Sequence, residues 1–235
     1  MCLKVGLRSC KELREAKWVT WQCKGLSAAD LTFLGTLGSV LPALEKMDLY
    51  DLTAGPDGGQ RLVAGLGAGA LPAVTELSII DMHVGDAGAS ALAAALGQGA
   101  LPRLKTLDLT NTAIGDAGLV ALAPALRRRP ALEQLDLYND PLGDEGLAAL
   151  VAPPLPAGAP PPPTGGLKKL KQLYLNHAQI TDTGCATLAA ALDSGVLPAL
   201  EYLDLHGIPA SDAAVAAVHE ALAKSRAAAS STSSV

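Results

Sequence analysis

Residues 101–126 read LPRLKTLDLTNTAIGDAGLVALAPAL, and the same pattern returns along most of the chain. The pattern begins with an LxxLxL segment typical of a strand. It passes through a turn ending in Ile-Gly-Asp-x-Gly and continues into an Ala- and Leu-rich helix. One such unit cannot bury its apolar face alone, so each unit requires stacked neighbours. The sequence therefore predicts one elongated repeat domain with a continuous core.

The first leucine of LxxLxL marks the phase of each unit. Subtracting successive marker positions gives spacings of 28, 30, 30, 28, 38 and 30 residues, which predicts seven units. The markers are Ala16, Leu44, Val74, Leu104, Leu132, Leu170 and Leu200. We interpret residues 1–15 as an N-terminal cap or degenerate repeat, 16–224 as the repeat domain, and the Ser/Ala-rich residues 225–235 as a disordered tail.

Each unit is expected to contribute one strand and one helix. The predicted strands are 18–22, 46–50, 76–80, 106–110, 134–138, 172–176 and 202–206. The predicted helices are 28–37, 60–66, 87–96, 117–126, 145–151, 183–192 and 211–224. Within the first strand, Trp21 takes a core position and Trp18 falls on the open face. We interpret both as a bulky plug on the end of the core.

The spacing of 38 residues contains a Pro- and Gly-rich insertion, PPLPAGAPPPPTGG at 153–166. Proline and glycine at this density cannot continue a helix or a central strand, so the insertion is expected to form a surface loop. Its APPPP segment could be a ligand for a domain that binds proline-rich peptides. A tolerated loop insertion is the favoured interpretation, because extra loop length costs little free energy.

Charged residues recur at both ends of the predicted helices. Asp86, Asp116, Asp144 and Asp182 stand where helices begin. A carboxylate there can accept free N–H groups and complement the helix dipole, so we interpret all four as structural. The run 127–129 is Arg-Arg-Arg and ends a helix, where positive charge is favourable; an anion site is the less favoured alternative.

Composition restricts the class of protein. Hydrophobic residues make up 49% of the chain and aromatics only 3%, so the core must consist of Leu and Ala. The net charge of −5 favours a neutral or basic protein partner over nucleic acid or anionic lipid. Mean hydropathy is +0.29, yet the longest apolar stretch, 31–44, is interrupted by Gly, Ser and Pro, so no membrane span is expected.

The cysteines and the N-terminus favour an intracellular, cytoplasmic location. The four cysteines, Cys2, Cys10, Cys23 and Cys185, form neither a CxxC motif nor a dense disulfide framework, so we expect reduced thiols and no metal site. The first residues, MCLKVGLRSCKELREAK, carry charges where a signal peptide has its apolar region.

The repeats resemble the ribonuclease-inhibitor-like subfamily of leucine-rich repeats. Their Ala-rich sequence with LPAL links is similar to repeat arrays of algae and other protists. The shared motif is LxxLxLxxxxIGDxGxxxLAxAL, clearest at 104–126 and repeated at 74–96, 132–150 and 170–192. The resemblance implies an α/β fold, a right-handed solenoid or horseshoe with a parallel sheet on the concave face and helices on the convex face.

One column departs from the family pattern. Leucine-rich repeats of this subfamily usually carry Asn or Cys two residues before the turn aliphatic, where it joins successive loops. Here the column reads Leu52, Met82, Thr112, Asp140, Ala178 and Ile208. We therefore expect that backbone groups or water satisfy these loops, and that the loop edge is looser.

Side chains alternate across a strand, so Met47 and Leu49 should point into the core while Asp48 and Tyr50 point outward. Seven parallel strands make a concave ribbon of roughly 29 Å. The four tyrosines of the chain all fall on this face. Tyrosine supplies contact area and Asp supplies electrostatic steering, so we interpret the face as a partner-binding surface. The candidate residues are Asp48, Tyr50, Asp108, Asp136, Tyr138, Tyr174, Asn176, Tyr202, Asp204 and His206.

The competing explanation for these aspartates is that LDL is a well-solvated strand pattern. His177, His206 and Asp204 are expected to be neighbours, but an open sheet excludes little water, so we predict no catalytic residue, metal or cofactor. The expected function is a non-enzymatic interaction module or scaffold subunit that captures a protein on the concave face, as a monomer within a larger complex. The alternative is a Ran-type GTPase-activating protein, a class with a similar fold, with Asn111 and Asn139 as candidate residues.

Overall fold

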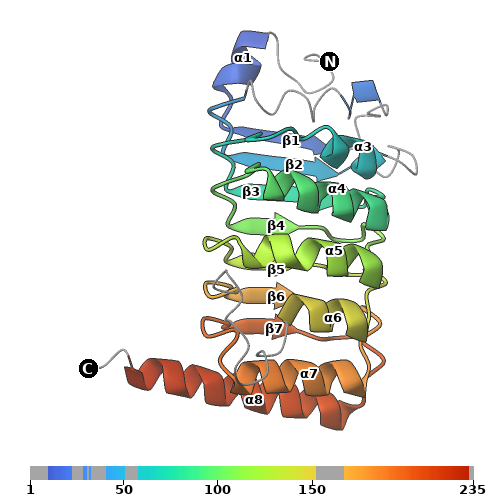
Figure 1. Ribbon diagram of the computed structural model, residues 1–235, viewed down its shortest axis with the longest axis vertical. Helices are drawn as coiled ribbons and strands as arrows, with labels where there is room; N and C mark the ends of the chain where they lie inside the picture. The colour runs from blue at the N-terminus through green and yellow to red at the C-terminus, as the bar shows by residue number, and fades with distance from the viewer. Residues whose placement is uncertain are drawn as a thin grey trace.

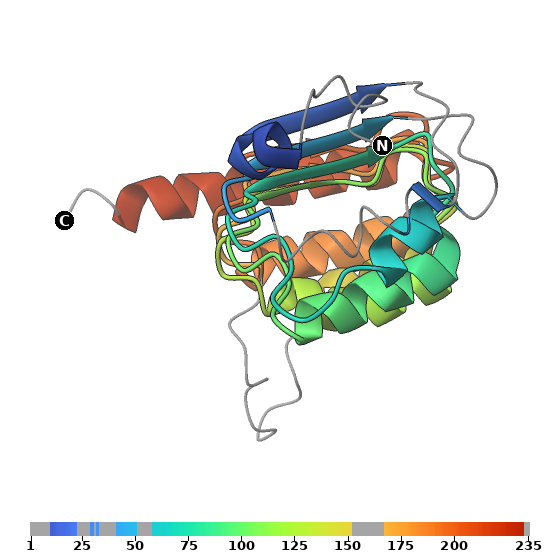
Figure 2. The same cartoon turned by 90° about the horizontal axis from the view of Figure 1, so that it is seen from above.

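The computed structural model describes residues 10–22, 29–30, 32, 41–50, 58–151 and 167–232. Seven parallel strands form one sheet in chain order, and helices cover one of its faces (Figures 1 and 2). The strands are β1 (Trp18–Gln22), β2 (Lys46–Tyr50), β3 (Glu76–Ile80), β4 (Thr106–Asp108), β5 (Gln134–Asp136), β6 (Gln172–Tyr174) and β7 (Tyr202–Asp204). This architecture is the predicted α/β solenoid of about seven repeats.

After α1, each described helix follows a strand in the chain. They are α1 (Cys10–Glu15), α3 (Gly58–Ala64), α4 (Gly85–Gly97), α5 (Asp116–Arg127), α6 (Asp144–Val151), α7 (Asp182–Asp193) and α8 (Asp212–Thr232). The tail predicted to be disordered from residue 225 is instead helical through Thr232, since its Ala residues extend α8. The predicted helix 28–37, the insertion at 153–166, Cys2 and Cys23 lie outside the described residues.

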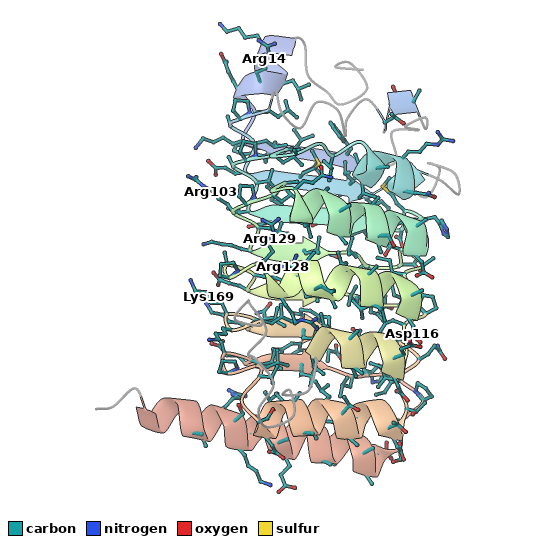
Figure 3. All side chains as sticks on the ribbon, in the orientation of Figure 1. Arg14, Arg103, Asp116, Arg128, Arg129 and Lys169 are labelled. Atoms are coloured by element: carbon teal, nitrogen blue, oxygen red, sulfur yellow. The ribbon has the colours of Figure 1, made fainter. Side chains whose placement is uncertain are left out.

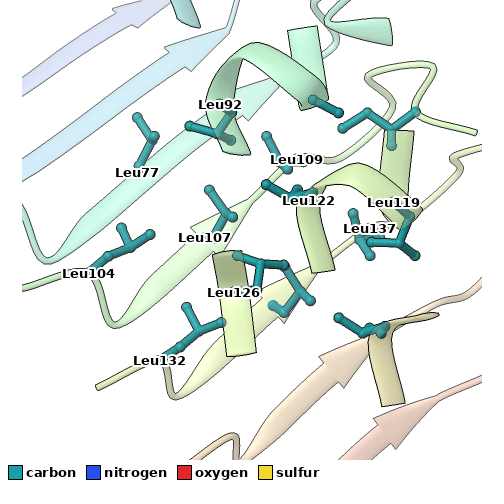
Figure 4. Close-up of a cluster of buried hydrophobic side chains, with 14 of the residues drawn as sticks. Leu77, Leu92, Leu104, Leu107, Leu109, Leu119, Leu122, Leu126, Leu132 and Leu137 are labelled. Carbon is teal, nitrogen blue, oxygen red and sulfur yellow. The ribbon is translucent and has the colours of Figure 1, made fainter. Parts of the chain in front are cut away.

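The core consists of stacked leucines between the sheet and the helices. The strands pair in phase, so that Leu107 lies beside Leu77 on one side and Leu135 on the other. Figure 4 shows leucines of β4 facing leucines of α5, among them Leu107 and Leu122, both fully buried. Met47, Leu49 and Trp21 are buried as predicted. Trp18 is 72% exposed, so the interpretation of this residue as a core plug is wrong.

The later strands are shorter than predicted. β1, β2 and β3 keep all five predicted residues, whereas β4 to β7 keep three. In three of the short strands an aspartate carboxylate accepts the backbone N–H two residues later. The acceptors are Asp108 from Thr110 at 3.0 Å, Asp136 from Tyr138 at 3.0 Å and Asp204 from His206 at 2.9 Å. The diverted N–H ends regular ladder pairing at that residue.

The helix-start aspartates act on the neighbouring repeat. Oδ1 of Asp86 accepts the N–H groups of Gly115 and Gly118 at 2.8 and 3.0 Å, at the start of α5. Asp144 and Asp182 make the equivalent contacts to Thr181 and Ser211 in the next repeats. The structural role was predicted, but each carboxylate bonds to residues at the start of the following helix rather than to its own helix.

The column that usually holds Asn or Cys is polar at the centre of the solenoid. Oδ1 of Asp140 accepts the N–H groups of Thr112 and Ile114 at 2.9 and 3.0 Å, across the joint between two repeats. Thr112 and Asp140 are buried, and burial raises the pKa of Asp140 to about 7. At this joint a carboxyl group takes the loop-bridging role, so the edge is not held by backbone and water alone.

Candidate functional site on the outer face of the sheet

The outer face of the sheet, turned away from the helices, displays the predicted partner-binding residues. Their side chains alternate with buried leucines along each strand. Tyr138 is 36% exposed and Tyr202 is 46% exposed, whereas Tyr50 and Tyr174 are half-buried. Large aromatic side chains that remain exposed on an ordered strand are contact area available to a partner.

Five ring side chains gather at the β5–β7 end of this face. The Tyr174 and Tyr202 centroids lie 5.2 Å apart. His177 makes edge contacts with Tyr138 at 5.4 Å and with His206 at 5.8 Å. We call these residues the aromatic cluster. Each ring borders the next repeat, so the cluster forms only because the strands are in phase.

His177 is the member that the sequence prediction left out of the site. It directly follows the outward-facing strand residues, and its backbone is left-handed with φ 61°. Gly207 allows it to fold over the face, because a Cβ at Gly207 would lie 2.5 Å from His177 Nδ1. A glycine one repeat after a rim histidine was the available signal in the sequence.

Half-buried carboxylates follow one column of the face. Asp108 lies beside Asp136, and Tyr174 separates Asp136 from Asp204. Burial raises the pKa of Asp108. Burial, with smaller contributions from the charges of Asp108 and Asp204, raises the pKa of Asp136 to about 6. Ionised carboxylates in this environment are poorly compensated, so a cationic group of a partner would be stabilised here.

Two predicted residues lie apart from the aromatic cluster. Asp48 and Tyr50 are on β2, three strands away from β5 in the sheet order. Lys46 contacts both Asp48, at 3.6 Å, and Glu76, at 3.0 Å, so charge at that end is partly compensated. Asn176 does lie between Tyr138 and His206 in the column, and its buried Oδ1 accepts no hydrogen bond from the described residues.

The rim asparagines are engaged with each other. Asn139 Nδ2 donates to Asn111 Oδ1 at 2.9 Å, and Asn111 Nδ2 donates to Asp81 Oδ1 at 2.6 Å. All three residues have left-handed backbones, with φ between 53° and 55°. Asn and Asp tolerate this conformation better than other non-glycine residues. The left-handed backbone therefore explains the residue types at these positions, whose side-chain hydrogen bonds form a ladder along the rim.

The described part of the chain offers no group of three or more His, Cys, Asp or Glu side chains placed to hold a metal ion. No helix in the same part is long and apolar enough to cross a bilayer. Cys185 is a buried free thiol, and burial raises its pKa. A shallow groove of 310 Å³ lies beside β7 and includes Asp204, His206 and His219.

Comparison with known proteins agrees with this architecture. A profile of the family described as "Leucine Rich repeat" matches residues 101–123 and 166–189. These matches, together with the stacked strand–helix units, support a leucine-rich repeat protein; the ribonuclease-inhibitor-like subfamily stays a prediction. No curated protein matches the chain.

Among solved structures, an internalin from Listeria monocytogenes is 14% identical, with a TM-score of 0.39. The similarity covers 77% of this chain and 54% of the internalin chain, so the chain spans about half of that protein's length.

Proposed function

We propose that this leucine-rich repeat protein is a non-enzymatic interaction module or scaffold subunit, and that it binds a protein partner on the outer face of its sheet. The observation that carries the proposal is the aromatic cluster. Tyr138 and Tyr202 remain exposed. Tyr138 contacts His177, which contacts His206, and Tyr202 contacts Tyr174, so neighbouring rings support both exposed tyrosines. Exposed tyrosine held by its neighbours loses little conformational entropy when it is buried by a partner.

The half-buried carboxylates of Asp108, Asp136 and Asp204 suggest the chemistry of that partner. A lysine or arginine placed over Tyr174 would lie between Asp136 and Asp204 and also against an aromatic ring. We therefore favour a partner surface with at least one basic side chain surrounded by apolar or neutral residues.

The test compares affinity purification with the wild-type chain and with a Tyr138→Ala/Tyr174→Ala/Tyr202→Ala variant. The variant should lose the partner while its far-UV circular dichroism is unchanged. Val120→Ala is the matched control, because Val120 is exposed but belongs to α5 on the opposite layer. Equal recovery by the wild-type chain and the triple variant would contradict the proposal.

The alternative function, activation of GTP hydrolysis by Ran, would rely on Asn111 and Asn139. Both are already bonded within the rim ladder, which weighs against their reaching a partner's catalytic site. A GTP hydrolysis assay with Ran addresses this alternative directly, and stimulation that Asn139→Ala abolishes would favour it over the scaffold.

A further inference from the structure

The two loop edges of the solenoid carry opposite charge. From β3 onward, the residues between each strand and the first turn of its helix include acidic residues but no Lys or Arg. The opposite edge, at 98–105, 127–133 and 167–171, contains eight of the chain's 18 Lys and Arg and one carboxylate, Glu133. Figure 3 shows Arg103, Arg128, Arg129 and Lys169 along one edge and Asp116 at the other.

Four of these eight cationic side chains make hydrogen bonds or ion pairs within the fold. Arg127 donates to the carbonyl of Ala149, and Arg129 donates to that of Leu96. Lys105 and Lys171 both contact Glu133, at 3.8 and 2.8 Å. The other four are exposed, and their side chains make no hydrogen bond or ion pair within the described part of the chain. They are Arg103, Arg128, Lys168 and Lys169, which we call the basic edge patch.

The repeat pattern does not require these side chains. In the LPAL link, the position of Arg103 and Lys169 is alanine in four other units, at Ala43, Ala73, Ala131 and Ala199. Lys168 replaces a proline of the same link. Complementing helix dipoles explains Arg127 and Arg129, which reach helix-end carbonyls. It does not explain Arg103, Lys168 and Lys169, which lie several residues past the end of a helix, although Arg128 directly follows α5.

The local charge balance favours an added anion. Hydrogen bonding to Lys171, with further contributions from the charges of Lys171, Lys105 and Lys169, lowers the pKa of Glu133. Glu201 also acts on Lys171 through its charge, so two carboxylates face three ammonium groups here. Burial and the charge of Arg128 lower the pKa of Arg127. Additional carboxylates here would relieve repulsion among the cations.

We propose that the basic edge patch binds an acidic, extended peptide segment of a partner protein. The patch spans three consecutive repeats, about 10 Å at the spacing of parallel strands, which an extended segment covers with carboxylates three residues apart. Nucleic acid fits less well. Its long charged backbone would also meet the acidic edge and the carboxylates of the sheet face.

The experiment measures fluorescence anisotropy of a labelled glutamate-rich peptide about six residues long, at about 50 mM and 200 mM salt. The test variant is Arg103→Ala/Arg128→Ala/Lys168→Ala/Lys169→Ala. The control variant is Lys11→Ala/Arg14→Ala/Lys224→Ala/Arg226→Ala. Each removes four positive charges and changes the formal net charge from −5 to −9, because −5 − 4 = −9.

The patch variant should bind about tenfold more weakly or worse, with the control variant within about twofold of wild type. Equal weakening in both variants would show an effect of net charge and overturn the proposal. Undetectable binding to the wild-type chain would overturn it too. Tighter binding of a single-stranded oligonucleotide of the same formal charge would assign the patch to nucleic acid instead.

Discussion

Oδ1 of Asp116 accepts the backbone N–H of Gly146 at 2.8 Å, so the first residue of α5 caps α6 in the following repeat. The same oxygen accepts the N–H of Gly143 at 2.7 Å. This contact explains the second glycine of Gly-Asp-x-Gly, because a Cβ at Gly146 would lie 2.7 Å from Asp116 Oδ1. The motif therefore joins two repeats, and the following prediction tests the joint.

Gly146→Ala should destabilise the protein by about 1–3 kcal/mol, because the added methyl group displaces the capping carboxylate. The cost should be smaller in an Asp116→Ala background, where the oxygen is already absent, and urea unfolding of the four proteins measures the difference. Gly97→Ala is the control, since a Cβ there meets nothing within 4 Å. Equal losses at positions 97 and 146 would contradict this explanation.

The buried carboxyl group of Asp140 should make stability depend on pH. Its pKa is about 7 in the folded chain against the ordinary aspartate value of 3.8, so the folded state binds more protons between these values. Stability is therefore fully present below about pH 4 and is lost as pH rises through about 7. Asp140→Asn should remove this loss, because an amide oxygen can accept the same N–H groups without a charge.

The measurement is the free energy of unfolding of wild type and Asp140→Asn across pH 4–8. We expect the variant to gain on the order of 2–4 kcal/mol relative to wild type between the two ends of this range. Asp86→Asn, at an exposed carboxylate, is the control. Parallel pH profiles for wild type and Asp140→Asn would show that Asp140 does not titrate in this range.

Asp136 offers a test of the electrostatics of the sheet face. Its pKa is raised to about 6 mainly by burial, with the charge of Asp108 contributing. Asp108→Asn should therefore lower the pKa of Asp136 while leaving it above the ordinary value. Carbon-13 NMR of the Asp136 carboxyl group measures the shift directly. An unchanged or higher pKa would mean that Asp108 does not act on Asp136 through its charge.

Neighbouring arginines at the end of α5 should differ in their effect on stability. The Arg129 side chain donates to the carbonyl of Leu96, whereas the Arg128 side chain makes no hydrogen bond or ion pair with the residues that the structure describes. Arg129→Ala should cost about 1–2 kcal/mol, since it removes the charged donor from the part-buried Leu96 carbonyl and leaves only the N–H of Gly99. Arg128→Ala should be nearly neutral. Thermal unfolding of both variants decides the matter, and similar losses would contradict the distinction.

The sequence by itself determined the repeat phase, the seven strands and the buried leucines. Alternation along a strand is a local property, so Met47 and Leu49 could be placed in the core without knowledge of any partner strand. The same alternation placed Tyr138, Tyr174 and Tyr202 on the outer face. The left-handed rim positions at Asn111 and Asn139 were not predicted as such, although their residue types permit them.

Tertiary structure alone decided which side chains meet. Asp116 acts on a helix 30 residues away, and Asp140 reaches Thr112 over 28 residues. His177 joins Tyr138 and His206 only because strands of different repeats stack in phase. Stacking also determined which cationic side chains have hydrogen-bond or ion-pair partners and which, such as Arg103 and Lys169, do not. Hydrogen bonds, burial and pKa depend on distances in space that spacing along the chain does not specify.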